Sequence, residues 1–198
     1  MKTVLIRTIL ASFLFGGAAL AQNSDLAILL GANGPNSGTV GAGVVSGQYG
    51  FGFQMNFAEQ LRETAAGQLY VEVPLVIATH SQSTVSNTVV TDLKDSIFFT
   101  PGVRWRFTPQ KRISFYAAGG FGIGSFGTST SYVSSGGLGN TSSRDTTFAF
   151  GFGGGIDFRL TRLLSLRAEG RDFITRTGLG ASSGHNHAFF MAGIGFHF

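Results

Sequence analysis

Eight charged residues stand at alternate positions in segments that are otherwise apolar or rich in glycine. They are Glu72, Arg104, Arg106, Asp157, Arg159, Arg167, Glu169 and Arg171. Carboxylates and guanidinium groups can share a protein interior only when they pair, because an unpaired buried ion is strongly unfavourable. The pattern therefore predicts a paired charge network that fills an interior. It also leaves open a narrow pore with a slight preference for anions.

A second candidate site lies at residues 180–184, which match the pattern G-x-S-x-G and are followed by His185. A nucleophilic serine in this pattern requires a sharp turn from a strand into a helix, and no helical pattern follows. We therefore expect a flexible loop here. The alternative is a hydrolase that uses Ser182 or Ser183 with His185.

No cofactor and no metal site is predicted. His185 and His187 could face the same way on an extended chain, with His80 as the one plausible third ligand, but zinc sites use three or four ligands. We expect ordinary histidines at a rim. Residues 122–127 match G-x-G-x-x-G but lack the helix that a dinucleotide site needs. The chain has no cysteine, which excludes disulfides and thiolate metal sites.

Alternation with a period of two dominates the chain, and it must position the charged residues. In residues 97–107, Val103 and Trp105 share one face, and Arg104 and Arg106 share the other. Strands place successive side chains on opposite faces, whereas a helix would scatter the two arginines. The same alternation predicts strands over residues 25–33, where it is weakest, and over 48–57, 68–77, 97–107, 113–123, 148–160, 164–173 and 190–198.

The composition indicates which face meets lipid. Charged residues make up 12 % of the chain, against about 25 % in typical proteins. No segment after residue 21 reaches the length of an apolar membrane helix, and only helices and closed barrels satisfy the backbone in lipid. Glycine, alanine, serine and a few charges suit the narrow interior of eight strands, and no charge falls on the apolar face of these strand centres. The predicted fold is all-β, a closed eight-stranded antiparallel up-and-down transmembrane β-barrel.

The connections differ in length, as in outer-membrane barrels. Short ones are expected at residues 58–67, 108–112 and 161–162, and long ones at residues 34–47, 81–95, 127–147 and 175–187. Aromatic residues at strand ends are expected to form girdles at the membrane interfaces: Tyr49, Trp105, Phe107 and Phe198.

The N-terminal segment is typical of an export signal. Lys2 and Arg7 precede an apolar run that ends in a small-residue cleavage pattern, so we expect cleavage after Ala21 and one domain over residues 22–198. An uncleaved anchor is the alternative. Removal of the two cations lowers the net charge by two from +4, and no basic stripe is present, so we expect no nucleic-acid partner.

The last eleven residues, AFFMAGIGFHF, and residues 118–124 and 155–162 resemble those of the small bacterial outer-membrane barrel family of the OmpA and OmpX type. The resemblance implies a place in the bacterial outer membrane, among its lipids and lipopolysaccharide. It also implies that Phe196 and Phe198 form a signal for the assembly machinery. We expect a monomer without enzymatic activity whose long loops face outward. The resemblance also implies what the hydrolase alternative would be, namely a lipid A-modifying hydrolase at the outer rim of the barrel, using Ser182 or Ser183 with His185. The family serves many functions, so none follows from the fold.

Overall fold

The computed structural model describes residues 23–34, 38–40, 43–45, 50–86, 89–134, 137–177 and 183–198, so the expected export signal lies outside them. No helix among the described residues is long and apolar enough to cross a membrane. Eleven strands are present in this part of the chain: β1 (Ser24–Asn33), β2 (Gly38–Val40), β3 (Gly43–Val45), β4 (Gly50–Thr64), β5 (Gly67–Ser86), β6 (Val89–Phe99), β7 (Gly102–Arg106), β8 (Ile113–Ser134), β9 (Gly137–Arg159), β10 (Leu164–Thr177) and β11 (Ser183–His197).

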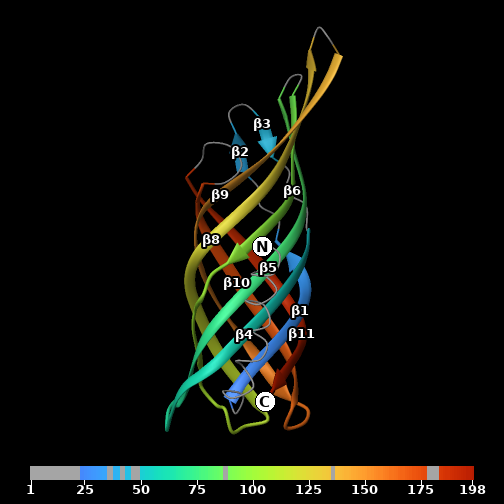
Figure 1. Cartoon of the computed structure of the whole chain (residues 1–198). Helices are drawn as coiled ribbons and strands as arrows, with labels where there is room; N and C mark the ends of the chain where they lie inside the picture. Colours follow the sequence, from blue (N-terminus) through green and yellow to red (C-terminus); the bar gives the residue numbers. More distant parts are fainter. Residues whose placement is uncertain are drawn as a thin grey trace, which may run out of the picture.

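Nine of these strands form one antiparallel sheet that closes on itself (Figure 1). Strand β1 pairs with β4 on one side and with β11 on the other, which joins the two ends of the chain. Strands β6 and β7 follow one another in the same position of the ring, between β5 and β8. The ring therefore has eight positions, as predicted. Closure leaves no free edge within the ring. Strands β2 and β3 form a separate hairpin.

The strand predicted over residues 97–107 is interrupted where β6 ends and β7 begins. Pro101 lies in this gap and has no amide hydrogen to donate to a neighbouring strand. Its carbonyl oxygen still accepts a hydrogen bond from the amide of Phe121, at 3.1 Å. Strands β5 and β8 pair with both β6 and β7, so the ring remains closed across the interruption.

The structure corrects the connections predicted over residues 58–67, 81–95, 127–147 and 175–187, which are largely strand. Strands β8 and β9, for example, stay paired as far as Ser134 and Gly137. The last three of these segments are rich in serine, threonine and glycine and lack apolar alternation, so the sequence indicated loops. Pairing with a neighbouring strand supplies their backbone hydrogen bonds. Long hairpins therefore extend beyond the barrel at the end opposite the short turns (Figure 1).

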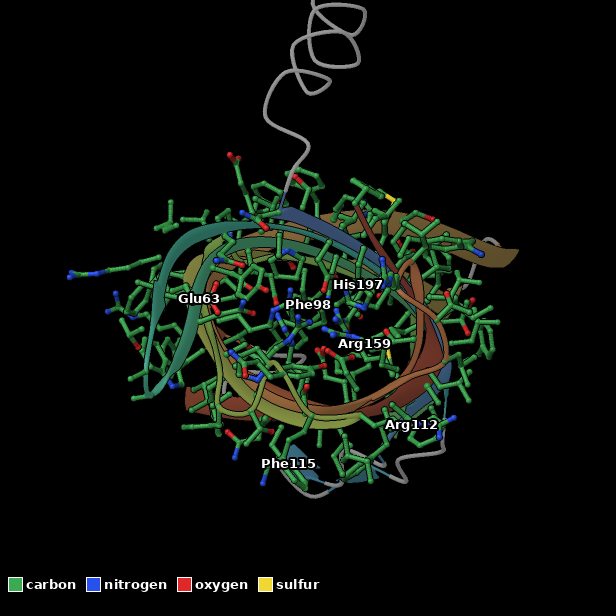
Figure 2. The ribbon with its side chains drawn as sticks, turned by 90° about the horizontal axis from the view of Figure 1, so that it is seen from below. Glu63, Phe98, Arg112, Phe115, Arg159 and His197 are labelled. Carbon is green, nitrogen blue, oxygen red and sulfur yellow. The ribbon has the colours of Figure 1, made fainter. Side chains whose placement is uncertain are left out.

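The side chains alternate between the two faces of the sheet as the sequence predicts. In β9, Phe148 and Ile156 are 57 % and 43 % exposed, whereas Asp157 is 4 % exposed. The view along the barrel shows Phe115 outside the ring and Phe98 inside it (Figure 2). The apolar face therefore points outward and the charged face inward, which inverts the arrangement of a soluble protein.

Charged residues also occur on the outward face of the strands, and Asp172 is an example. Asp172 shares the outward face of β10 with Leu166 and Ile174, in the half of the strand nearer the long hairpins. Its side chain is partly buried. Asp172 lies near the end of the strand predicted over residues 164–173, so the expectation that the strand centres carry no outward charge does not extend to it.

Three of the aromatic residues predicted at strand ends lie at the end of the barrel with the short turns. Phe107 and Phe198 are 50 % and 48 % exposed, and Trp105 is partly exposed. Tyr49 lies outside the described residues.

The turn between β4 and β5 depends on Gly67, whose φ of +146° is unusual for residues with a side chain. A Cβ atom at this position would lie 2.3 Å from the carbonyl oxygen of Arg106 and 3.0 Å from Nε1 of Trp105. Glycine therefore allows the close approach of the turn to β7.

We expect Gly67→Ala to lower the free energy of unfolding by about 1–3 kcal/mol, because backbone strain adds to the steric conflict. Urea unfolding in detergent micelles, followed by fluorescence of Trp105, the one tryptophan of the chain, measures this loss. The control is Ala66→Gly in the same exposed turn, which should change stability by about 0.5 kcal/mol or less. Equal losses in the two variants would contradict the role of Gly67.

Candidate functional site

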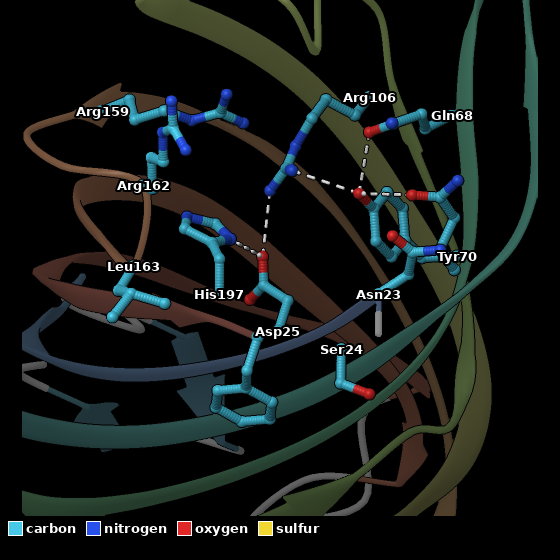
Figure 3. A pocket seen from close by; sticks show the side chains of 12 residues that line it. Asn23, Ser24, Asp25, Gln68, Tyr70, Arg106, Arg159, Arg162, Leu163 and His197 are labelled. Atoms are coloured by element: carbon cyan, nitrogen blue, oxygen red, sulfur yellow. Dashed lines mark hydrogen bonds and ion pairs between the residues drawn. The ribbon is translucent and has the colours of Figure 1, made fainter. Parts of the chain in front are cut away.

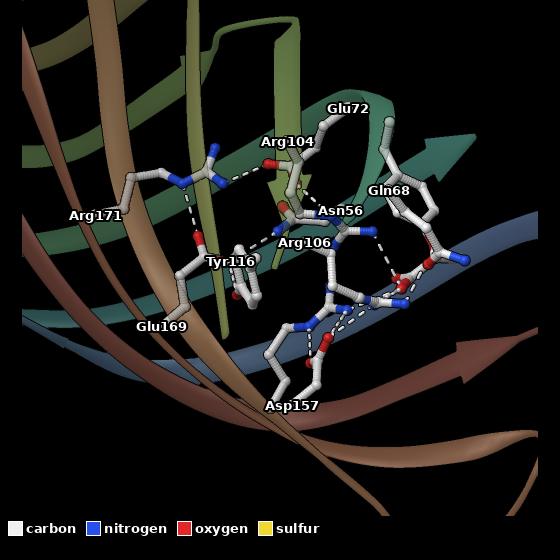
Figure 4. A network of polar contacts seen from close by, with 12 residues as sticks. Asn56, Gln68, Glu72, Arg104, Arg106, Tyr116, Asp157, Glu169 and Arg171 are labelled. Atoms are coloured by element: carbon white, nitrogen blue, oxygen red, sulfur yellow. Dashed lines mark hydrogen bonds and ion pairs between the residues drawn. The ribbon is translucent and has the colours of Figure 1, made fainter. Parts of the chain in front are cut away.

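The strands bring seven of the eight predicted charged residues together in the lumen, near the short turns (Figure 4). All seven are at most 5 % exposed: Glu72, Arg104, Arg106, Asp157, Arg167, Glu169 and Arg171. The eighth, Arg159, does not join them. It lines a pocket at the mouth of the barrel and pairs with no carboxylate of the described residues. Its inclusion in the network was therefore wrong, because it lies two residues closer to the end of β9 than Asp157 does.

Asp25 completes the network. Its Oδ2 lies 3.1 Å from Nη2 of Arg104 and 2.9 Å from Nη2 of both Arg106 and Arg167. Nδ1 of His197 lies 3.2 Å from the same oxygen. With Asp25, four carboxylates face four guanidinium groups, so the formal charge of the network is balanced. Sequence reasoning missed Asp25 because the alternation is weakest in the first strand.

The part of the network nearest the mouth is built around Asp157. Its Oδ1 accepts a hydrogen bond from Nε of Arg167 at 2.6 Å, and its Oδ2 accepts one from Nη2 of Arg106 at 2.8 Å. Since Arg106 and Arg167 also contact Asp25, each of these two guanidinium groups joins two carboxylates. Four charges from β1, β7, β9 and β10 are thereby tied into one unit.

Deeper in the lumen, Glu72 and Glu169 share one cation. Arg171 donates Nε to Oε1 of Glu169 at 2.6 Å and Nη2 to Glu72. Oε2 of Glu169 also accepts the hydroxyl of Tyr116 at 2.6 Å, and Oε1 accepts the amide of Gln54 at 2.7 Å. The tyrosine hydroxyl satisfies the carboxylate oxygen that the arginine does not reach, and the amide of Gln54 adds a second donor to the oxygen that the arginine does reach.

Arg104 connects the two parts of the network and is wholly buried. Besides its contact with Asp25, its Nε lies 3.5 Å from Oε2 of Glu72. Its guanidinium carbon lies 4.9 Å from the ring centroid of Tyr70 and 5.4 Å from that of Tyr116. Aromatic faces attract cations, so these rings stabilise a charge that water does not reach.

A second, apolar layer closes the lumen on the side of the long hairpins. The rings of Phe98 and Phe173 stack with centroids 4.4 Å apart, and Phe189 packs edge-on against both. All three are completely buried. The alternation over residues 97–107 puts Phe98 on the same face as Arg104 and Arg106, but the sequence did not predict this aromatic layer.

His187 belongs to this layer, so the expectation of a rim position was wrong. It is 5 % exposed, and its ring centroid lies 5.4 Å from that of Phe98 and 5.1 Å from that of Phe126. Its Nε2 lies 3.2 Å from Oγ1 of Thr175. Alternation along β11 turns this side chain inward, where it fills space beside the phenyl rings.

The other predicted motifs find no further support. Ser182 lies outside the described residues, and the structure describes the backbone but not the side chains of Ser183, His185 and His80. The lipid hydrolase therefore stays a prediction. Among the described residues, no three metal-binding side chains gather. Residues 122–127 lie within β8 and pair with β9, and from Ile123 onward they also pair with β6, which rules out the strand-to-helix turn of a dinucleotide site.

No protein-family model matches the sequence, and the comparison with curated proteins found no match. Solved structures do match in fold. Ail, the attachment invasion locus protein of Yersinia pestis, is 15 % identical with a TM-score of 0.51, and the match covers 88 % of this chain and 99 % of Ail. OprG, an outer membrane protein of Pseudomonas aeruginosa, is 10 % identical with a TM-score of 0.53, covering 90 % and 96 %. OmpT, an outer membrane protease of Escherichia coli, is 9 % identical with a TM-score of 0.54, covering 89 % and 97 %.

The chain therefore has the fold of small outer-membrane β-barrel proteins. At these identities the likeness concerns the fold alone, and proteins that share it include a protease as well as an attachment protein. The fold does not select between such functions. The more specific resemblance to the OmpA and OmpX type stays a prediction.

We expect Asp25→Asn to lower the free energy of unfolding by about 3–5 kcal/mol, because it leaves buried guanidinium groups short of one counter-charge. Equilibrium unfolding in urea measures the loss. The matched control is Asp95→Asn, which removes a carboxylate that pairs with Arg144 at 2.5 Å on the exposed surface. An exposed pair contributes about 1 kcal/mol or less. A small loss in both variants would show that ion pairing does not hold the lumen.

Proposed function

We propose that this protein resides in the bacterial outer membrane, where its barrel is a closed anchor that presents its long hairpins at the cell surface. The observation that carries the proposal is the inverted alternation: large apolar side chains cover the outside of a closed ring while balanced charges fill its inside. Such a ring satisfies its own backbone, and its outer face suits acyl chains. The short turns then face the periplasm.

The lumen supports an anchor rather than a pore. A solute would have to pass the ion network and then the stacked rings of Phe98 and Phe173, two closed layers in series. The network also has no excess of positive charge once Asp25 is included, which removes the basis for an anion preference. The narrow pore remains an alternative without an observation in its favour.

The hairpins offer the surface on which a partner could bind. Pairing between β9 and β10 ends at Ala149 and Thr175, whereas β9 continues to pair with β8 as far as Gly137. Among the described residues, β9 therefore has no neighbour on its other side over residues 137–148. The side chains of residues 140–146 are exposed and mostly polar. An edge of this kind can accept an extended segment of another protein as an added strand.

The C-terminal strand supports the proposed recognition by the assembly machinery. Phe196 and Phe198 point outward and are 37 % and 48 % exposed, so both rings are accessible at the surface of the barrel. Lipids and lipopolysaccharide are the expected surroundings of this face. We propose a monomer without enzymatic activity.

Single-cysteine labelling tests the location and the orientation, because the natural chain contains no cysteine. We expect Ser143→Cys, on the exposed part of β9, to react with a membrane-impermeant maleimide on intact cells. Gln110→Cys, in the exposed short turn between β7 and β8, should react only after the outer membrane is permeabilised. The reverse pattern, or equal labelling of both variants on intact cells, would contradict the proposal.

A charge placed in the centre of the outer face tests the contact with lipid. Ile28→Arg, in the middle of β1, should lower the free energy of unfolding in phospholipid vesicles by about 2–4 kcal/mol. Ile113→Arg should cost about 1 kcal/mol or less, because Ile113 begins β8 beside a short turn. The two isoleucines are similarly exposed, at 40 % and 47 %, so they differ mainly in depth. Equal losses would indicate that no hydrocarbon surrounds the ring.

A further inference from the structure

A pocket of about 280 Å³ opens into the lumen at the end with the short turns (Figure 3). Asp25 and Arg106 line this pocket, so the charge network forms part of its wall. Arg159, at the end of β9, and Arg162, in the turn that follows, line the same pocket. Figure 3 shows these two side chains reaching toward Arg106 from the opposite side.

This pocket carries more positive charge than the network can balance. Asp25 is the one carboxylate side chain among its lining residues, and Arg104, Arg106 and Arg167 already surround it. No ion pair joins Arg159 or Arg162 to a carboxylate in the part of the chain that the structure describes. The guanidinium groups of Arg159 and Arg162 therefore bring two positive charges to the pocket, beyond the four that the network balances.

A buried donor in the pocket wall also lacks an acceptor. Arg106 is 3 % exposed, and its Nε–H has no hydrogen-bond partner among the described residues. A buried polar group without a partner is rare and unfavourable. Neutral polar groups complete the lining, among them Gln68 and the hydroxyl of Tyr70. The pocket thus offers several donors around an excess of positive charge.

We propose that this pocket binds a phosphate group, carried either by a small soluble molecule or by a phospholipid headgroup. Guanidinium groups match phosphate oxygens in charge and in geometry, and their charge-assisted hydrogen bonds are strong. A phosphate group has enough oxygens to accept hydrogen bonds from both Arg159 and Arg162 at once, whereas a single carboxylate offers only two oxygens. The volume holds the phosphate with a few attached atoms. The choice of these two sources of phosphate rests on the proposed function, in which this end of the barrel faces the periplasm and the inner leaflet of the outer membrane.

The test uses the folded barrel in micelles of a nonionic detergent, titrated with inorganic phosphate at constant ionic strength set with chloride. Arginine Nε–H signals, followed by NMR, should shift and saturate at Arg106, Arg159 and Arg162. Arg159→Gln and Arg162→Gln should each weaken phosphate binding about tenfold, through loss of one charge-assisted hydrogen bond.

The matched control is Arg112→Gln. Arg112 is exposed at the same end of the barrel, but it lies over the ring of Phe158 and does not line the pocket. This variant should bind phosphate as the unaltered protein does. An equal loss in Arg112→Gln would show a general effect of net charge and would overturn the proposed site.

Nanodiscs with and without phosphatidylglycerol distinguish the two sources. Saturable shifts with inorganic phosphate support a soluble ligand, and shifts of the same signals with phosphatidylglycerol alone support a headgroup. Shifts that chloride reproduces, or that rise linearly with the phosphate concentration, indicate an adventitious ion only. If phosphatidylglycerol also produces no shift, this result overturns the proposal. The micelle measurement does not depend on orientation, so its failure leaves the outer-membrane location to be judged by cysteine labelling.

Discussion

Closure of the sheet by the pairing of β1 with β11 is the constraint on which the rest of this structure depends. In hydrocarbon, a backbone amide or carbonyl without a partner costs several kcal/mol, so a sheet must leave no edge. Nine residues of β1 pair with nine of β11, from Asp25 with His197 to Asn33 with Phe189. Once the ring is closed, each side chain must point either outward or into a narrow lumen. The alternation along the strands then determines which groups meet in each place.

Closure also explains how a buried charge network can be tolerated. The lumen of eight strands holds little beyond side chains, so the ions there are desolvated and must satisfy one another. Asp25 and His197 are brought together by the same pairing that closes the ring, and Asp25 in turn contacts three arginines from β7 and β10. The strand pairing positions the ions, and the ion pairs in turn hold the strands in one register.

Closure of the ring also makes the two ends of the barrel differ in chemistry. Strands that run past the ring pair only with each other, and these hairpins carry serine, threonine and asparagine and expose an edge of β9. At the opposite end the turns are short, and the lumen opens directly onto its own charges. Arg159 and Arg162 lie there without a carboxylate of their own among the described residues, beside Arg106, whose charge the network already balances. One end thus offers backbone groups to a partner, while the other offers positive charge.

The sequence alone determined the strands, their two faces and the inward direction of the charges, because these follow from a local period of two. It predicted eight positions, and the inner place of Arg104, Arg167 and Glu169 agrees with the structure. Only the tertiary structure decided which ions meet. Asp25 of β1 joins the network because the fold brings it beside arginines of β7 and β10, which are distant in sequence. Arg159 stays at the mouth because it lies two residues beyond Asp157, at the end of β9. The aromatic layer and the length of the hairpins were decided in the same way, since packing across a lumen and pairing between polar strands depend on neighbours that no local pattern records.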